Sequence, residues 1–87
     1  MKIKQGFILR EVADSFLVVA VGDAVKQFNG VINLNETGAF LWRLLEKGAT
    51  EEELKTALLN EYDVDGETAA RDIKAFLEKL ENANLVD

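Results

Sequence analysis

The sequence contains no cysteine and no histidine. Without cysteine, disulfide bonds and thiolate metal sites are excluded. Without histidine, the commonest general base and the commonest metal ligand are missing. Ser15 is the only serine, and no histidine exists to activate it. No Gly-rich phosphate loop is present, and nothing in the pattern isolates two carboxylates in an apolar pocket. We therefore expect a protein that is not an enzyme and holds no cofactor.

Long apolar runs are also lacking, since none approaches the roughly 20 residues that a membrane-spanning helix requires. The first six residues carry two lysines but no apolar stretch of a signal peptide follows. We expect a cytoplasmic protein without a membrane partner. The length of 87 residues, 48% of them hydrophobic, predicts one domain spanning residues 1–87.

The formal net charge is −6, and most of the excess negative charge follows Asn35. Binding of nucleic acid or anionic lipid requires concentrated Lys and Arg. The acidity therefore counts against a nucleic-acid partner.

The N-terminal third has the pattern of β-strands. Apolar runs at residues 7–12 and 16–21 flank a short polar turn and predict a hairpin. The second run is apolar on both faces, which predicts a central strand covered on each side. Asn29-Gly30 favours a tight type I′ turn before a third strand at residues 31–34. A short extra strand at residues 25–28 is a further expectation.

The remainder is predicted to be helical. A first helix spans residues 36–47, with Asn35 as its N-cap and Gly48 just after its end. Thr50 and Glu53 form a capping box that opens a second helix. A third helix begins after Asp65, which we expect to be its N-cap. Its apolar stripe comprises Ala69, Ile73, Phe76, Leu77 and Leu80. Strands followed by three short helices predict an α+β fold.

Three positions in the first helix have competing interpretations. Gly38 costs about 1 kcal/mol relative to Ala inside a helix, so a close contact should compensate. We expect a tight crossing with another helix, and direct ligand contact is the alternative. Phe40 and Trp42 point to different faces, and a core position is favoured for both.

Residues 61–72 nearly match a calcium-binding EF-hand loop. Glu61 replaces the usual Asp at the first position, and Asp72 replaces the usual Glu at the last. Asp65 already has a role as a helix N-cap. Helix capping is therefore favoured over a metal site.

The strand at residues 31–34 passes without a loop into the helix capped by Asn35. This junction leaves one strand edge beside the helical layer. An exposed edge is a template for another chain, and a neighbouring helix supplies side-chain pockets. The pair suits β-augmentation by an extended peptide.

Nearly the whole chain resembles the PqqD family, named for protein D of pyrroloquinoline quinone biosynthesis. The resemblance lies in Asn-Glu-Thr-Gly-Ala-Phe-Leu-Trp at 35–42, Thr-Glu-Glu-Glu-Leu at 50–54, and Tyr-Asp-Val-Asp at 62–65 with the helix after it. This family is the prototype of the RiPP recognition element, where RiPP denotes a ribosomally synthesised, post-translationally modified peptide. The resemblance implies a winged helix-turn-helix-like fold, with a three-stranded antiparallel sheet followed by three α-helices.

The resemblance also implies a function. Such domains bind the leader segment of a precursor peptide as an added strand and present it to a modifying enzyme, often a radical SAM protein. Carried onto this sequence, the strand wall of the site comprises Gly30, Val31, Ile32, Asn33 and Leu34. The helix wall comprises Ala69, Asp72, Ile73, Phe76 and Lys79.

Two other functions remain as alternatives. Winged helix-turn-helix domains usually bind DNA, so a transcriptional regulator is the second hypothesis. A small calcium sensor is the third. An uncovered strand edge could also pair with a second copy, which makes a homodimer a possible state.

Overall fold

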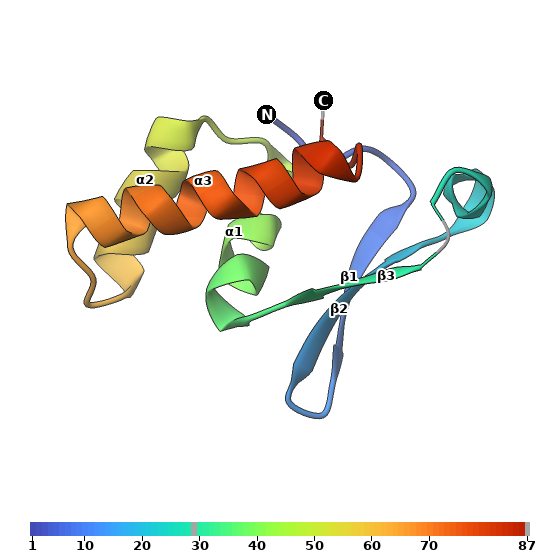
Figure 1. Ribbon diagram of the computed structural model, residues 1–87, viewed down its shortest axis with the longest axis horizontal. Coiled ribbons are helices and arrows are strands. Elements are labelled where there is room, and N and C mark those ends of the chain that lie inside the picture. Colours follow the sequence, from blue (N-terminus) through green and yellow to red (C-terminus); the bar gives the residue numbers. More distant parts are fainter. Residues whose placement is uncertain (29, 87) are drawn as a thin grey trace.

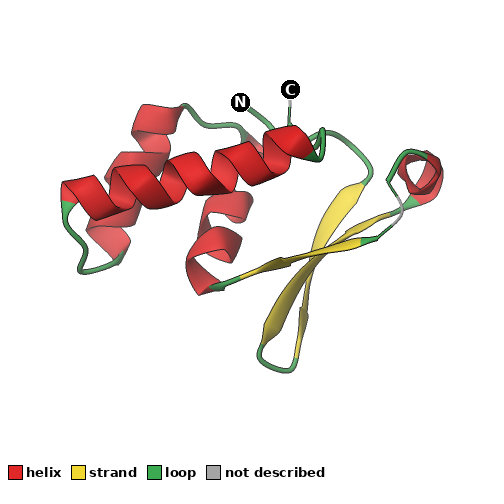
Figure 2. Ribbon diagram, viewed as in Figure 1, coloured by secondary structure: helices red, strands yellow, loops and turns green. Residues whose placement is uncertain are grey.

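The computed structural model describes residues 1–28 and 30–86. The Asn29 half of the predicted tight turn lies outside the described residues. In chain order the elements are β1 (Phe7–Val12), β2 (Ser15–Ala20), the 3-10 helix η1 (Gly22–Lys26), β3 (Val31–Leu34), α1 (Glu36–Lys47), α2 (Glu51–Glu61) and α3 (Gly66–Asn82). The helices gather into one body from which the sheet extends, and α3 crosses the front of that body in this view (Figures 1 and 2). The predicted α+β class and element order are confirmed.

The sheet is antiparallel, with strand order β1-β2-β3, so the predicted central strand is confirmed as β2. Its predicted cover on both faces is wrong. Val18 is fully buried against the helical core, whereas its neighbours Leu17 and Val19 are only partly buried. Strand side chains alternate between faces, and the core includes residues of the Val18 face alone. The helices therefore cover one side of the sheet.

The predicted extra strand at residues 25–28 is wrong as well, because the chain forms η1 over Gly22–Lys26. Gly22 has φ 63, a left-handed conformation that turns the chain away from the direction of β2. Phe28 then folds back, and its ring meets that of Phe7 edge-on with the centroids 5.8 Å apart. These contacts close the end of the sheet next to the start of β3.

Side-chain caps fix where the first two α-helices begin. The Asn35 side-chain oxygen accepts a hydrogen bond from the Gly38 N–H at 2.7 Å. Thr50 Oγ1 accepts from the Glu53 N–H at 3.1 Å, and the Glu53 carboxylate accepts from the Thr50 N–H at 2.8 Å. Each bond satisfies a donor that the helix itself leaves unpaired. The bounds of α1 are those predicted, and Gly48 caps its C-terminus with φ 95.

Asp65 caps α3, as predicted. Its carboxylate accepts from the Thr68 N–H at 2.6 Å. This bond favours the charged form and lowers the pKa of the Asp65 carboxyl from its ordinary value. Within the described ranges, no group of three or more acidic, His or Cys side chains is placed to hold a metal ion.

The core lies between the three helices and one face of the sheet. Trp42 is its largest fully buried side chain, and its indole Nε1 has no hydrogen-bond partner among the described atoms. Phe40 is only partly buried and packs edge-on against Tyr62, with ring centroids 5.5 Å apart. Val86 is buried and pairs with Ile3, outside the three strands. None of the described helices combines the length and apolarity needed to cross a bilayer.

The expectation that Gly38 marks a helix crossing is wrong. A Cβ at this position would lie 3.3 Å from Leu34 Cβ and 3.2 Å from the Asn35 side-chain oxygen. The close approach is therefore to the end of β3 and to the cap residue. Gly38 lets the strand turn directly into α1, which sets the angle between β3 and the helices.

Candidate peptide-binding groove

One edge of β3 is unpaired. β3 pairs with β2 on one side, and no strand in residues 1–28 or 30–86 pairs with the other side. Such an edge presents backbone donors and acceptors that another chain can use. Backbone groups of successive residues point to opposite edges of a strand. Which β3 residues face the free edge therefore depends on which residue pairs exchange backbone hydrogen bonds, which we call the hydrogen-bonding phase of the sheet.

The β1–β2 hairpin fixes that phase. Val12 pairs with Ser15, which leaves a two-residue loop between them. The pair that closes a two-residue loop exchanges both backbone hydrogen bonds, and bonded pairs recur at every second residue. The backbone groups of Ser15, Leu17 and Val19 therefore bond to β1. The backbone N–H and C=O groups of the β2 residues between these three point to β3.

The same alternation continues across β3. Val18 lies opposite Ile32, and this pair uses its backbone groups within the sheet. The N–H and C=O groups of Val31 and Asn33 consequently point outward, to the free edge. Two residues thus offer both a donor and an acceptor to an incoming strand.

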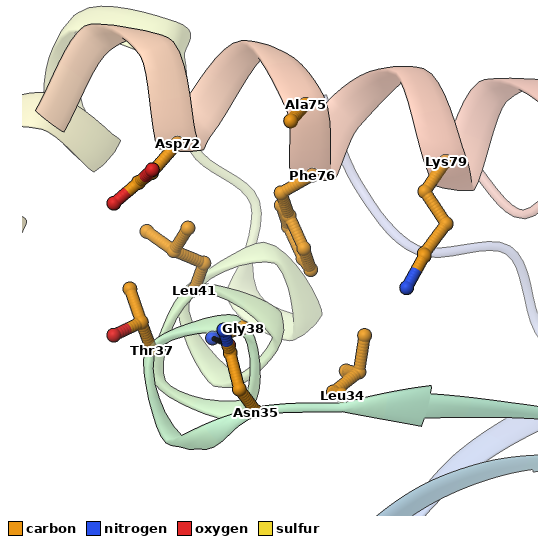
Figure 3. A pocket seen from close by; sticks show the side chains of 9 residues that line it. All are labelled: Leu34, Asn35, Thr37, Gly38, Leu41, Asp72, Ala75, Phe76 and Lys79. Carbon is orange, nitrogen blue, oxygen red and sulfur yellow. Dashed lines mark hydrogen bonds between the residues drawn. The ribbon is translucent and has the colours of Figure 1, made fainter. Parts of the chain in front are cut away.

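A cavity lies between this edge and α3 (Figure 3). Its volume is ≈ 240 Å³. Leu41 and Phe76 are almost fully buried and form its apolar floor. Asp72 and Lys79 project into it from α3, two helical turns apart (Figure 3). The remaining lining residues are Leu34, Asn35, Thr37, Gly38 and Ala75.

A second, more open cavity of ≈ 610 Å³ continues along β3. It is lined by Phe28, Gly30, Val31, Ile32, Asn33, Lys79, Asn82 and Ala83. Lys79 lines both cavities, so together they form one groove between β3 and α3. We call it the β3–α3 groove. The Lys79 ammonium donates to the Asn33 backbone oxygen at 3.3 Å and so spans the groove.

The predicted site residues separate into two groups. All five strand residues, 30–34, line the β3–α3 groove, as do Asp72, Phe76 and Lys79. Ala69 and Ile73 lie outside it, with 0% and 2% of their surface exposed in the core. They occupy the neighbouring stripe of α3, which faces the other helices.

Sequence reasoning missed part of the lining. On α3 it missed Ala75 and Asn82, with Ala83 just after the helix, and on α1 it missed Thr37, Gly38 and Leu41. It also missed Phe28 and the cap residue Asn35. The α3 residues follow the helical spacing of Asp72 and Lys79, so that spacing was the available signal. The α1 residues carried no such signal, because their place depends on how β3 turns into the helix.

Residues 9–86 match the family described as "Coenzyme PQQ synthesis protein D (PqqD)". The chain belongs to the PqqD family. The family assignment made from caps and core spacing is thereby confirmed. No curated protein sequence matches the chain.

Two solved structures resemble this PqqD-family chain. One, described as "TbiB1 in Complex with the TbiA(beta) Leader Peptide", has a TM-score of 0.78 and 30% sequence identity, covering 100% of this chain and 95% of that one. The other, "Lasso peptide synthetase B1 complexed with the leader peptide", has a TM-score of 0.74 and 20% identity, covering 97% and 93%. The second likeness shows a shared fold alone.

Proposed function

We propose that this protein binds the leader segment of a ribosomally made precursor peptide by strand addition at the free edge of β3. The observation that carries the proposal is the outward orientation of the Val31 and Asn33 backbone groups beside the β3–α3 groove. An extended peptide can bond to these groups while its alternate side chains enter the groove. The related chain TbiB1, 30% identical over the full length, was solved with a leader peptide, which supports the same class of ligand here.

The expected affinity has two sources. Each new backbone hydrogen bond contributes about 0.5–1.5 kcal/mol net. A leucine-sized side chain that enters the groove over Leu41 and Phe76 adds about 1.5–3 kcal/mol. Neither source alone offsets the cost of ordering a flexible peptide. Recognition should therefore require a strand with apolar side chains on the face toward α3.

The proposed role is presentation rather than catalysis. The sequence has no histidine, the commonest general base, and no cysteine nucleophile. The bound leader would instead hold the precursor near a modifying enzyme. A radical SAM enzyme is the expected partner, from the resemblance to PqqD proteins.

A DNA-binding role is disfavoured by the charge of α3, the helix that would read the major groove. Four acidic residues outnumber three basic ones on this helix. The acidic residues are Glu67, Asp72, Glu78 and Glu81, and the basic residues are Arg71, Lys74 and Lys79. Phosphate binding needs the opposite balance.

The test is a titration of ¹⁵N-labelled protein with a synthetic peptide. Its sequence is taken from the N-terminal half of a short open reading frame beside the gene. We expect saturable amide shifts in residues 30–34 and along the groove face of α3, and none with a scrambled peptide. Shifts confined to the β1–β2 turn would reject the site. Tight binding of a DNA duplex in a low-salt mobility-shift assay would favour the regulator instead.

The same edge could serve a homodimer, because two β3 strands can pair with each other. In that case peptide and second copy compete for the same backbone groups. Light scattering with and without peptide separates the two uses, since a leader peptide should then reduce the dimer fraction.

A further inference from the structure

Lys79 occupies the position where an added strand must bind. Its ammonium lies 3.3 Å from the Asn33 backbone oxygen, which points to the free edge of β3. In Figure 3 its side chain extends from α3 toward the strand, beside Phe76. A strand that adds to β3 directs an N–H group at the same carbonyl oxygen. Binding therefore requires Lys79 to release or share this acceptor.

A displaced ammonium needs a new partner, because a charge in a groove that a peptide closes loses part of its hydration. Asp72 is the acidic residue that shares the cavity with it, but it lies seven residues earlier, about 10 Å away along the helix axis. The incoming peptide is the nearer source of a carboxylate. A glutamate or aspartate on the peptide face toward α3 would meet the ammonium directly.

Resting on the function proposed above, we infer that Lys79 selects the leader by charge. In the free protein it holds the Asn33 oxygen, and in the complex it pairs with an acidic side chain of the leader. The recognised segment is an extended peptide in which this acidic residue stands between two apolar ones, each two positions away.

The spacing follows from the groove. Residues of an added strand that face α3 lie opposite Leu34, Ile32 and Gly30, about 7 Å apart. The position opposite Leu34 opens into the cavity floored by Leu41 and Phe76, and the position opposite Gly30 opens into the second cavity. Lys79 lines both cavities and stands between these two positions. The pattern is symmetric, so it holds whichever way the peptide runs.

The test uses two synthetic probes, acetyl-Thr-Leu-Thr-Glu-Thr-Leu-Thr-amide and the same peptide with Gln in place of Glu. Each is titrated by amide shifts into the wild type, Lys79→Met and Lys74→Met. Methionine keeps an unbranched apolar stem and removes the charge. Lys74 is an exposed lysine of α3 that lines neither cavity of the groove, so its variant is a matched control for net charge.

The wild type and Lys74→Met should bind the Glu probe roughly 2- to 5-fold more tightly than the Gln probe. Lys79→Met should bind the two probes with about equal affinity, so that the ratio of the two affinities falls to about 1. The Gln probe should bind Lys79→Met at least as tightly as the wild type, because the Asn33 oxygen no longer has a competing donor. If Lys79 merely stabilised the groove, its replacement would lower the affinity for both probes alike and leave the ratio of the two affinities unchanged.

Several results would overturn the inference. If Lys79→Met kept the wild-type ratio of affinities for the Glu and Gln probes, Lys79 would not be the residue that recognises the acidic side chain. Failure of both probes to bind the wild type would show that the recognition pattern is wrong. If the genomic leader peptide still bound at residues 30–34 in that case, the proposed function would stand and only the role of Lys79 would fall.

Discussion

Replacing Val31 and Ile32 by proline, one at a time, tests which backbone N–H group of β3 faces the free edge and which one bonds to β2. Proline removes the backbone N–H without removing the carbonyl. The Val31 N–H points to the free edge, so Val31→Pro removes no hydrogen bond within the sheet, and proline is tolerated on edge strands. The Ile32 N–H bonds to Val18, a residue with 0% exposure. Ile32→Pro therefore leaves a buried carbonyl unpaired, at a cost of about 1–3 kcal/mol.

In urea unfolding we expect the free energy of unfolding of Val31→Pro to remain near that of the wild type. That of Ile32→Pro should fall by at least about 1–3 kcal/mol. A loss of 1 kcal/mol corresponds to a fall of about 4–8 °C in Tm for a domain of this size. Leader binding should behave differently. Val31→Pro leaves a peptide carbonyl without its donor, so affinity should fall about 5- to 150-fold.

Val31→Ala is the matched control, because it keeps the N–H and shortens a side chain that is 55% exposed. Its stability should be close to that of the wild type, and it should lose less leader affinity than Val31→Pro because its N–H is retained. Equal destabilisation by the two prolines would show that the bonding phase derived from the hairpin is wrong. Unchanged leader binding by a folded Val31→Pro would refute strand addition at this edge.

Three further predictions concern the caps and the core. Asn35→Ala should cost about 0.5–2 kcal/mol in urea unfolding because α1 loses its N-cap, and Asn35→Asp should not; an equal cost for both would contradict the cap. The hydrogen bond from the Thr68 N–H lowers the folded pKa of Asp65. This group should therefore stabilise the fold above its unfolded pKa near 3.8, and the contribution should be lost as pH falls through the lowered folded value. The free energy of unfolding should fall less steeply with decreasing pH in Asp65→Asn than in the wild type. An identical pH dependence in the two proteins would refute the lowered pKa of Asp65. Trp42→Ala should cost about 3–5 kcal/mol in chemical denaturation, and the fluorescence of native Trp42 should shift to the red on unfolding. A red-shifted native emission would show that the indole is not buried.

The parts of the fold that the sequence predicted well are those encoded locally. Asn35, the Thr50–Glu53 pair and Asp65 each accept a hydrogen bond from an N–H three residues ahead, so short motifs mark where the helices begin. The central position of β2 followed from its long apolar run. The family resemblance depends on the same caps and core spacings.

The errors arose where the outcome depends on distant contacts. Residues 22–28 contain two large apolar side chains, at positions 25 and 28, a spacing that fits a helical turn as well as a broken strand. Ala69 and Ile73 were placed in the groove by the family resemblance, but the structure buries both in the core. Phe76 lines the groove and also belongs to the core, so the pattern alone could not separate the two faces.

The pairing of Ile3 with Val86, the last described residue, brings the N-terminal segment of the domain against its C-terminal segment. A backbone bond from the Lys4 N–H to the Leu85 oxygen, 2.8 Å long, reinforces this closure. A short linker could therefore join the ends, with new termini opened at the Ala13–Asp14 loop. Such a circular permutant would carry its termini on the hairpin tip, and the domain in its present order could be spliced into a surface loop of a host enzyme as a portable docking unit.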